Sequence, residues 1–329
     1  MKNSYSNFLK NIFLFIPLLI ISCGSPNQET KKSYEDEIEG FWERKGTIQF
    51  INDIPVDTLL YADGDINEVE NFRNIKVFSN NHIMWLNNAP DNQNAWKGGP
   101  GGYGKYKIHS YDSLTEYMSH GTGGMGAWMH YLLDSLKIDK QPFPFTTNLL
   151  TNSYWQKGGR LPDNNDNKSY AEYYERMPKS SEKNMLDGVW KRAYEISYVN
   201  GIAVDTTSVP SDVVLDIKTM YRGRFIYQVD QTGLAERGLA LHGGFGGYGQ
   251  FEYDGKGNLV EYDEFGSGNF PGSLERGPKT DGGYKKVTFY SDDLFLQVDK
   301  DTLNQGGMGF GSAETSNKTF RGLVYERVK

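Results

Sequence analysis

Apolar and polar residues alternate with a period of two along several short segments of this chain. Tyr106 and Ile108 fall on one face of such a segment, whereas Lys105 and Lys107 fall on the opposite face. A period of two is typical of a β-strand that buries one face and exposes the other. The segments are short and are separated by stretches rich in glycine, asparagine and aspartate, which favours an all-β chain with tight turns.

The same pattern occurs twice. Residues 40–44, Gly-Phe-Trp-Glu-Arg, return as 188–192, Gly-Val-Trp-Lys-Arg, and 52–58 return as 200–206, in both cases 148 residues later. A repeat of this length is a duplicated domain and not a solenoid unit. We therefore expect two tandem domains, over residues 38–177 and 186–329, joined by a linker at 178–185.

Strand parity is also duplicated. Ile83 and Trp85 share a face, as do their counterparts Phe225 and Tyr227 in the second copy. Successive short strands with tight turns predict an up-and-down antiparallel β-barrel in each copy, and closing the sheet removes edges that would promote aggregation.

Particular residues carry a resemblance to a known family. A Gly-x-Trp motif near the start of each copy and an arginine near its end resemble the lipocalin, or calycin, pattern. That resemblance implies that an arginine lies across the tryptophan ring and closes one barrel end, with Trp42 paired to Arg176 and Trp190 to Arg327. The Tyr-Trp-Gln-Lys-Gly sequence at 154–158 resembles lipocalin-like domains of Bacteroidetes lipoproteins.

The N-terminus predicts export. Lysines precede an apolar run at 12–21, which is too short to span a bilayer. Cys23, the only cysteine of the chain, follows that run, as in bacterial lipoprotein signals. We expect a signal peptide at 1–22, lipidation of Cys23, and a flexible tether at 23–37. Glycine at position 24 favours, by analogy, an outer-membrane lipoprotein of the cell envelope in either leaflet.

Charge excludes one class of partner. Removing residues 1–22 takes away two lysines and no acidic residue, so the formal net charge falls from −7 to −9. An acidic chain without a basic run lacks the electrostatic footprint of a nucleic-acid-binding protein. The single cysteine also excludes intrachain disulfides.

No catalytic or cofactor motif stands out. The glycine-rich segments at 98–104 and 243–249 lack the lysine and helix of a phosphate-binding loop, so we interpret them as β-hairpins. His120 and His130 flank one glycine-rich segment, but two histidines without further ligands are weak evidence for a metal. We expect no cofactor and no metal, and a catalytic role is the least favoured interpretation.

Lumen-facing residues are the candidate ligand contacts. In copy one they are Ile83, Trp85, Tyr106, Ile108 and Tyr117, and in copy two Phe225, Tyr227, Phe251, Tyr253 and Tyr262. Glu116 and Glu261 are equivalent, and each is either a polar anchor in the lumen or a surface charge. The surface position is favoured because carboxylates are rarely buried.

One segment differs between the copies. Residues 126–137, which include Trp128, are consistent with either a short amphipathic helix or another strand, whereas copy two has a polar, glycine-rich segment there. As a helix, the segment would act as a lid, with Trp128 facing the ligand. This difference favours copy one as the ligand-binding barrel.

Three functional interpretations follow. The first is a lipid-anchored envelope protein that holds a small apolar or amphipathic ligand in one or both barrels. The second is an interaction module that binds a protein or glycan through its glycine- and aromatic-rich loops. The third is an enzyme that acts at a barrel mouth, for which the sequence shows no catalytic constellation.

Overall fold

The computed structural model describes residues 33–60, 73–88, 101–122, 142–158, 168–211, 213–231, 243–268, 283–299 and 319–329. The predicted signal peptide at 1–22, Cys23, His130 and the segment 126–137 with Trp128 lie outside these residues. Both copies lie within one compact unit, Tyr34–Lys329.

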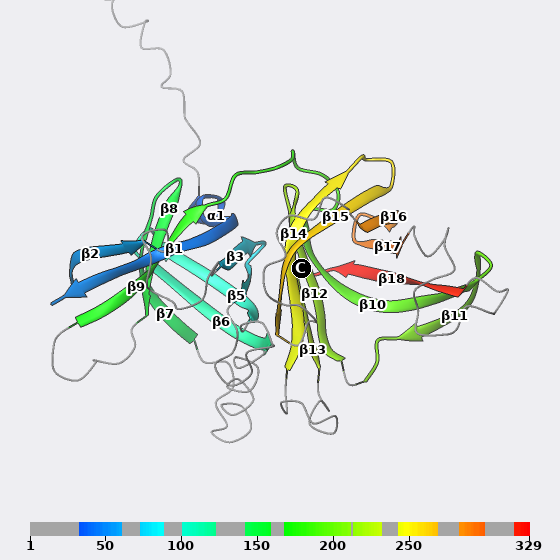
Figure 1. Cartoon of the computed structure of the whole chain (residues 1–329), viewed down its shortest axis with the longest axis horizontal. Coiled ribbons are helices and arrows are strands. Elements are labelled where there is room, and N and C mark those ends of the chain that lie inside the picture. Colours follow the sequence, from blue (N-terminus) through cyan, green and yellow to red (C-terminus); the bar gives the residue numbers. More distant parts are fainter. Residues whose placement is uncertain are drawn as a thin grey trace, which may run out of the picture. The chain divides into compact units, whose positions relative to one another are not determined.

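The described elements are one short helix and eighteen strands (Figure 1). Copy one contains α1 (Tyr34–Ile38), β1 (Gly40–Ile51), β2 (Ile54–Leu60), β3 (Asn74–Ser79), β4 (His82–Asn87), β5 (Gly101–Ser110), β6 (Ser113–Thr122), β7 (Pro142–Leu149), β8 (Ser153–Gly158) and β9 (Lys168–Arg176). Copy two contains β10 (Gly188–Val199), β11 (Ile202–Ser208), β12 (Val213–Tyr221), β13 (Arg224–Gln231), β14 (Gly243–Tyr253), β15 (Asn258–Gly268), β16 (Gly283–Ser291), β17 (Leu294–Asp299) and β18 (Thr319–Arg327).

Both copies form closed eight-stranded antiparallel barrels, as the sequence predicts. In barrel 1 the order is β1-β3-β4-β5-β6-β7-β8-β9, and β9 pairs back with β1. Barrel 2 repeats this order from β10 to β18. Only β2 and β11 stand outside the closure, each paired along the far half of the long first strand.

The repeated Asn-x-Ile-x-Val-Asp-Thr motif explains the hairpins that β2 forms with β1 and β11 forms with β10. Asn52 and Asp53 have φ of 50° and 63°, as a type I′ hairpin turn requires, and Asn200 and Gly201 repeat the turn. The aspartate that follows accepts a hydrogen bond from the next backbone N–H at 2.8 Å in both copies, beside a bulge. The side chain thus occupies one backbone donor of an exposed edge strand, a protection that such edges need.

One end of barrel 1 is closed by stacking and by main-chain carbonyls. The guanidinium of Arg176 lies 4.0 Å from the ring centre of Trp42 and donates to the carbonyls of Glu37 and Glu39. The indole of Trp42 donates to the carbonyl of Ile38 at 2.8 Å. This stacking contributes about 0.5–2 kcal/mol.

Barrel 2 repeats the closure residue by residue. Arg327 lies 4.1 Å from the ring centre of Trp190 and donates to the carbonyls of Met185 and Asp187, while the indole donates to Leu186. The paired tryptophan and arginine therefore have the arrangement that the lipocalin resemblance implies. The arrangement is structural and identifies no ligand.

Helix α1 changes the expected boundary of the tether. Residues Tyr34–Ile38 form this helix, although the sequence predicts a flexible tether up to residue 37. Ile38 is buried in the interior of barrel 1, and the ring of Tyr34 packs edge-on against Tyr111. The segment is ordered because its apolar residues close the end of the barrel. No helix among the described residues is long and apolar enough to cross a membrane.

The two barrels share an apolar cluster formed by equivalent outer faces. Barrel 1 contributes Phe41, Ile75, Val77, Met84, Leu86 and Tyr103, and barrel 2 contributes Val189, Leu215, Ile217, Ile226, Tyr248 and Phe265. Burial of this many apolar side chains fixes one barrel against the other. The faces are related by the duplication itself, since Ile75 matches Ile217 and Tyr103 matches Tyr248.

Polar contacts around this cluster are also made by equivalent residues of the two copies. In barrel 1, Nδ1 of His82 lies 2.8 Å from the hydroxyl of Tyr103. In barrel 2, the equivalent Arg224 donates to the hydroxyl of Tyr248 at 2.5 Å. Arg73 bridges the copies, with ion pairs to Glu43 at 2.7 Å and Glu264 at 2.6 Å.

The glycine-rich segments are strands, and their interpretation as hairpins is wrong. Gly101–Gly104 begin β5 and Gly243–Gly249 begin β14, and none of these glycines has a positive φ. They are required for close approach. A Cβ on Gly104 would lie 2.1 Å from the carbonyl oxygen of Tyr117, and a Cβ on Gly249 would lie 2.1 Å from that of Tyr262.

Candidate ligand-binding cups in the two barrels

The interior of barrel 1 has one half, near Trp42, that is packed with aromatic rings, and a second half whose inward aromatic side chains are only half-buried. In the packed half, Tyr154 stacks on Tyr174 with ring centres 4.8 Å apart and meets Trp42 edge-on at 4.8 Å. Phe78 packs edge-on against Tyr106, also at 4.8 Å. These rings fill the space, so this half is core and not a binding site.

This second half, here called cup 1, has aromatic walls. Trp85 of β4 is paired with Gly102 on the neighbouring strand β5. A Cβ added to this glycine would come within 2.5 Å of the indole nitrogen. The ring therefore lies flat on the glycine and forms a platform. Phe143 and Phe145 of β7 pack against the same cluster. All three rings are half-buried although they pack against the inward-facing cluster.

Below the aromatic walls lies a polar floor. The ammonium of Lys76 lies 2.9 Å from Oε1 of Glu116 and 3.0 Å from the amide oxygen of Gln156. The amide nitrogen of Gln156 donates to Glu172 at 3.0 Å, and the hydroxyl of Tyr174 donates to Glu172 at 2.9 Å. Alternation along β3 and β6 places Lys76 beside Phe78, and Glu116 between Leu114 and Met118, on the inner face.

The pKa values of two carboxylates of this floor are shifted in opposite directions. Burial raises the pKa of Glu116 even though Lys76 opposes the shift. Burial also acts on Glu172, but Arg44, which lies 3.3 Å from it, and Lys76 outweigh burial and lower its pKa. With Arg44 and Lys76 against two carboxylates, the floor is balanced in charge when both acids are ionised.

Cup 2, the corresponding half of barrel 2, keeps the platform but not the apolar walls. Tyr227 lies flat on Gly247, where an added Cβ would come within 2.5 Å of the ring. At the positions of Phe143 and Phe145, however, β16 carries Gly283 and Lys285. Phe245 packs edge-on against Tyr227 with ring centres 6.4 Å apart.

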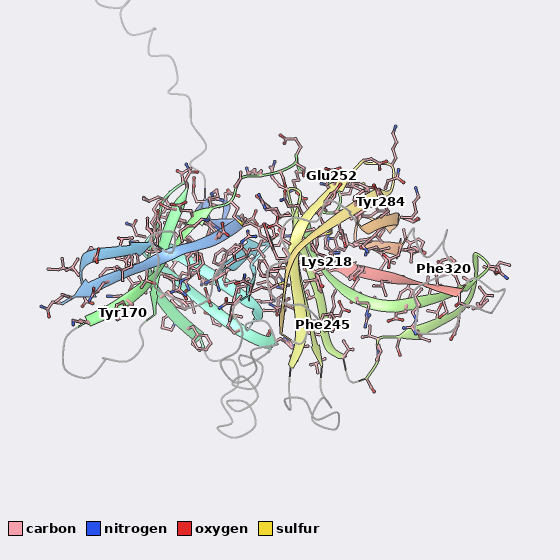
Figure 2. All side chains as sticks on the ribbon, viewed as in Figure 1. Tyr170, Lys218, Phe245, Glu252, Tyr284 and Phe320 are labelled. Carbon is pink, nitrogen blue, oxygen red and sulfur yellow. The ribbon has the colours of Figure 1, made fainter. Side chains whose placement is uncertain are left out.

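Charged pairs dominate the floor of cup 2. Lys218, the counterpart of Lys76, pairs with Glu261, and Lys285 lies 3.8 Å from the same carboxylate. Arg192 lies 3.1 Å from Asp216. Figure 2 labels Lys218 on β12 and Phe245 on β14, the two strands that flank the platform strand β13. Burial raises the pKa of Asp216, although Arg192 opposes the shift.

The residues predicted to line the lumen divide between the inner and outer faces of the barrels. Eight candidates lie in the inner core clusters or pack directly against them: Ile83, Trp85, Tyr106, Ile108, Phe225, Tyr227, Phe251 and Tyr253. Only Trp85 and Tyr227 among them border the cups as platforms. Tyr106 and Phe251 belong to the packed halves.

Two equivalent pairs of residues lie on the opposite faces from those predicted. Tyr117 and Tyr262 lie on the outer faces, and their assignment to the lumen is wrong. Glu116 and Glu261 are 5% and 8% exposed and lie inside, so the favoured surface position is also wrong. The physical reason is a lysine partner in each barrel, which offsets the cost of burying a carboxylate.

The cup residues that the sequence analysis missed come from strands whose inner and outer faces it did not assign. Lys76 and Lys218 sit at equivalent positions within apolar strands, and a lysine repeated at such a position in both copies signals a buried charge. Gln156 and Gln297 are likewise equivalent. Phe145 carried no signal, since its inward direction depends on the register of β7.

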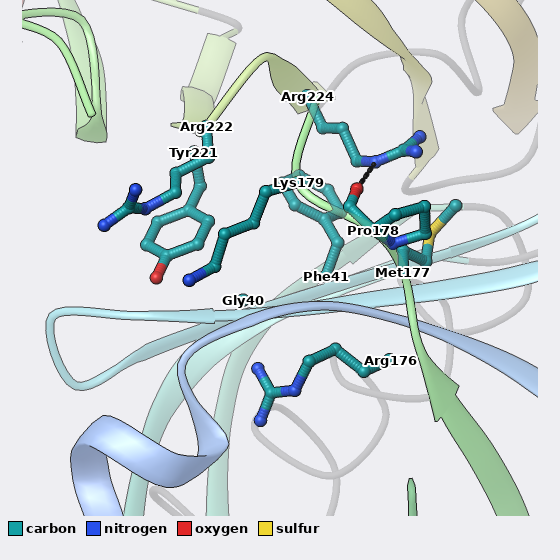
Figure 3. A pocket seen from close by; sticks show the side chains of 9 residues that line it. All are labelled: Gly40, Phe41, Arg176, Met177, Pro178, Lys179, Tyr221, Arg222 and Arg224. Atoms are coloured by element: carbon teal, nitrogen blue, oxygen red, sulfur yellow. Dashed lines mark hydrogen bonds between the residues drawn. The ribbon is translucent and has the colours of Figure 1, made fainter. Parts of the chain in front are cut away.

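A third space lies where the linker passes between the barrels (Figure 3). Arg176, Lys179, Arg222 and Arg224 line it together with Gly40, Phe41, Met177, Pro178 and Tyr221. Arg224 donates to the carbonyl of Pro178 at 3.0 Å, the contact dashed in Figure 3. The space has room for about one water molecule, and its arginines bind protein groups, so it is a packing junction.

Comparisons with known proteins leave the family open. No protein-family model matches the chain, and no curated protein matches it. Among solved structures, one similar chain is that of the vaccine antigen transferrin binding protein B, a Tyr-Ala and Trp-Ala double mutant from Haemophilus parasuis Hp5. The identity is 8%, the match covers 88% of this chain and 76% of that one, and the TM-score is 0.23. We rest no argument on a likeness of this size.

Among the described residues, no group of three or more histidine, cysteine, aspartate or glutamate side chains is placed to hold a metal ion. Of the two histidines considered for a metal, His120 lies on β6 with its Nδ1 2.9 Å from the hydroxyl of Ser119.

Proposed function

We propose that this chain is a lipid-anchored envelope protein, tethered through Cys23, that holds a small amphipathic molecule in cup 1. The observation that carries the proposal is the combination of three half-buried inward aromatic rings, Trp85, Phe143 and Phe145, with a charge-balanced polar floor. Ligand sites are typically concave and mostly apolar, with a few fixed polar groups.

The floor and the walls suit different parts of one molecule. An apolar body would bury against the aromatic rings at about 25 cal/mol for each Å² removed from water. A polar end would meet the floor of Lys76, Glu116 and Gln156. Because the charges of that floor already balance, an uncharged polar end fits better than an ionic one, which would be buried without a partner.

The alternative of recognition through glycine- and aromatic-rich loops loses part of its basis. Residues 101–104 and 243–249 are strands whose glycines accommodate neighbouring backbone and aromatic rings. Two further glycine- and aromatic-rich segments, 120–128 and 265–272, also belong to that interpretation, and the structure describes only 120–122 and 265–268 of them.

Native mass spectrometry of the full chain, purified gently from its own envelope and released from detergent, tests the proposal. We expect an adduct of a few hundred daltons that organic solvent extracts. Phe145→Lys, which installs the barrel 2 residue in cup 1, should remove the adduct. Thr146→Lys adds the same charge on the adjacent, exposed position and should leave it. A wild-type chain without an adduct, or an adduct kept by Phe145→Lys, would refute binding in cup 1.

A further inference from the structure

Barrel 1 carries an exposed apolar surface at the end of β1 that is far from Trp42. There, residues 46–51 of β1 form a three-stranded sheet with β2 on one side and residues 168–173 of β9 on the other (Figure 1). We call this sheet lip 1. Directly paired residues of neighbouring strands lie on the same face of a sheet, so the pairing registers show which side chains lie together.

One face of lip 1 continues the inner face of the barrel, because it includes Glu172 of the cup 1 floor. Each row of paired residues on this face runs from β2 across β1 to β9. Going outward from the floor, the rows are Leu59–Thr47–Glu172, Asp57–Gln49–Tyr170 and Ile54–Ile51–Lys168.

The apolar side chains of this face are exposed to an unusual degree. The exposed fractions are 36% for Ile51, 41% for Leu59, 50% for Tyr170 and 64% for Ile54. Figure 2 labels Tyr170 on β9. Together they present on the order of 400 Å² of apolar surface, a size at which patches on soluble proteins commonly mark interaction sites.

The free edge of β2 is protected against the addition of another strand. Pro55 has no backbone N–H to offer, and the N–H of Thr58 donates to the carboxylate of Asp57. A partner therefore meets lip 1 through the side chains of its face and not through the backbone of its edge.

Lip 2, the equivalent sheet of barrel 2, has the same backbone and a more polar face. Its strands β11, β10 and β18 pair in the same register as β2, β1 and β9. Arg321, whose side chain is 75% exposed, stands in the place of Tyr170, and Thr207 stands in the place of Leu59. The fold therefore does not require the apolar face of lip 1.

The charges of lip 1 suit a second copy of the same face. Asp57 and Lys168 are both exposed and lie at diagonal corners of the two outer rows, with Gln49 and Ile51 between them. A two-fold axis in the plane of contact, perpendicular to the line from Asp57 to Lys168, sets each carboxylate against the ammonium of the other copy. Such an arrangement is self-complementary, as an isologous interface requires.

The size of the face predicts a weak dimer. With the polar residues of the rows included, two copies would bury on the order of 1,000 Å², which is the low end for a specific interface. We infer that lip 1 is a self-association surface through which two copies of this chain dock face to face, with Asp57 of each copy opposite Lys168 of the other. This dimer does not depend on the ligand proposed for cup 1.

Chemical crosslinking of the full chain in its own envelope tests the inference. Sheets packed face to face stand about 10 Å apart, too far for a disulfide between facing residues, so the crosslinker is the short bismaleimide bismaleimidoethane. Gln49→Cys lies near the two-fold axis and should give a band at twice the mass of the chain. Ser197→Cys, the same position in lip 2, is the matched control and should give at least about fivefold less. The wild-type chain, with Cys23 as its only cysteine, sets the background.

Two further sets of variants, each made together with Gln49→Cys, test the apolar rows and the charges. Tyr170→Arg and Leu59→Thr install the lip 2 residues, so each should fold and should reduce the dimer band at least about fivefold. Lys168→Asp should weaken the band by setting carboxylates against each other. Adding Asp57→Asn, which keeps the hydrogen bond to Thr58, should restore part of it. Circular dichroism verifies that each variant is folded.

The inference is overturned if Gln49→Cys yields no more dimer than Ser197→Cys. It is also overturned if the dimer band persists unchanged in both Tyr170→Arg and Leu59→Thr, because the contact would then lie elsewhere. A crosslinked band of a different mass in place of the dimer would overturn it too, since lip 1 would then bind another protein.

Discussion

The two barrels have the same strands and the same closed end, yet their cups have opposite chemistry. In both, an aromatic ring lies flat on a glycine, Trp85 on Gly102 and Tyr227 on Gly247. Phenylalanine rings surround the first platform, and ion pairs surround the second. The two copies therefore keep the residues that determine the backbone of the barrel and differ in the residues that line the cup.

The packed halves differ in a related way. Tyr154 and Tyr106 of barrel 1 correspond to Phe295 and Phe251 of barrel 2. Both tyrosine hydroxyls are buried without a hydrogen-bond partner. Barrel 1 therefore keeps two hydroxyls deep in its packed half, where barrel 2 has phenylalanine, and barrel 2 adds Lys285 to the charges of its cup.

Removing a floor lysine should have the largest effect on stability, and the loss should differ between the two barrels. Lys76→Met leaves Glu116 buried and unpaired, so we expect a loss of about 3–5 kcal/mol in the free energy of unfolding. Lys218→Met should cost less, because Lys285 remains 3.8 Å from Glu261. Urea denaturation followed by circular dichroism measures both. The double variant Lys76→Met/Glu116→Gln should regain part of the loss, and equal losses for the two lysines would contradict the difference.

The equivalent interface residues His82 and Arg224 should differ in their response to pH. Burial, with Lys105 as a second cause, lowers the pKa of His82 from 6.5 to about 4. The unfolded chain therefore takes up a proton at this residue before the folded chain does. Its contribution to stability is present above pH 6.5 and is lost as the pH falls toward 4, by about 3 kcal/mol.

The variant His82→Gln can still hydrogen-bond Tyr103 but does not titrate. We expect the difference in unfolding free energy between wild type and variant to change between pH 6.5 and 4, as measured by urea denaturation across that range. Arg224→Gln is the control, since the arginine stays charged throughout. A pH-independent difference for His82→Gln would show that its imidazole does not titrate as described.

The platforms should show the smallest of these effects. Gly102→Ala places a Cβ within 2.5 Å of the Trp85 indole, and Gly247→Ala places one equally close to Tyr227. Each should cost about 1–3 kcal/mol, because the ring must leave its position. At Gly158 an added Cβ meets only Phe145 at 3.5 Å, so Gly158→Ala should change stability by less than about 0.5 kcal/mol. Thermal unfolding measures all three, and a Gly102→Ala variant as stable as Gly158→Ala would argue against the platform.

The sequence could predict what depends on periodicity and repetition. Alternating residues such as Ile83 and Trp85 predict strands, and the duplication predicts two barrels, because these features follow from local backbone geometry. The pairs Trp42–Arg176 and Trp190–Arg327 could be located only by resemblance.

The glycine segments, Tyr117 and Glu116 could not be placed by periodicity. Both faces of β6 carry apolar residues, Leu114 and Met118 on one and Tyr117 on the other, so the alternation alone does not say which face is buried. The pairing of Glu116 with Tyr106 across the two strands decides it, and that register does not appear in a pattern of apolar and polar residues.

The sequence by itself determined an all-β chain, its duplication and its acidic charge, and it predicts an N-terminus of the lipoprotein type. Tertiary structure alone decided that Lys76 meets Glu116 across 40 residues of chain, and that outer faces of the two copies form one apolar cluster. The physical reason is that strand patterns arise from neighbours along the chain, whereas ion pairs and packed faces depend on which strands the closed sheet brings together.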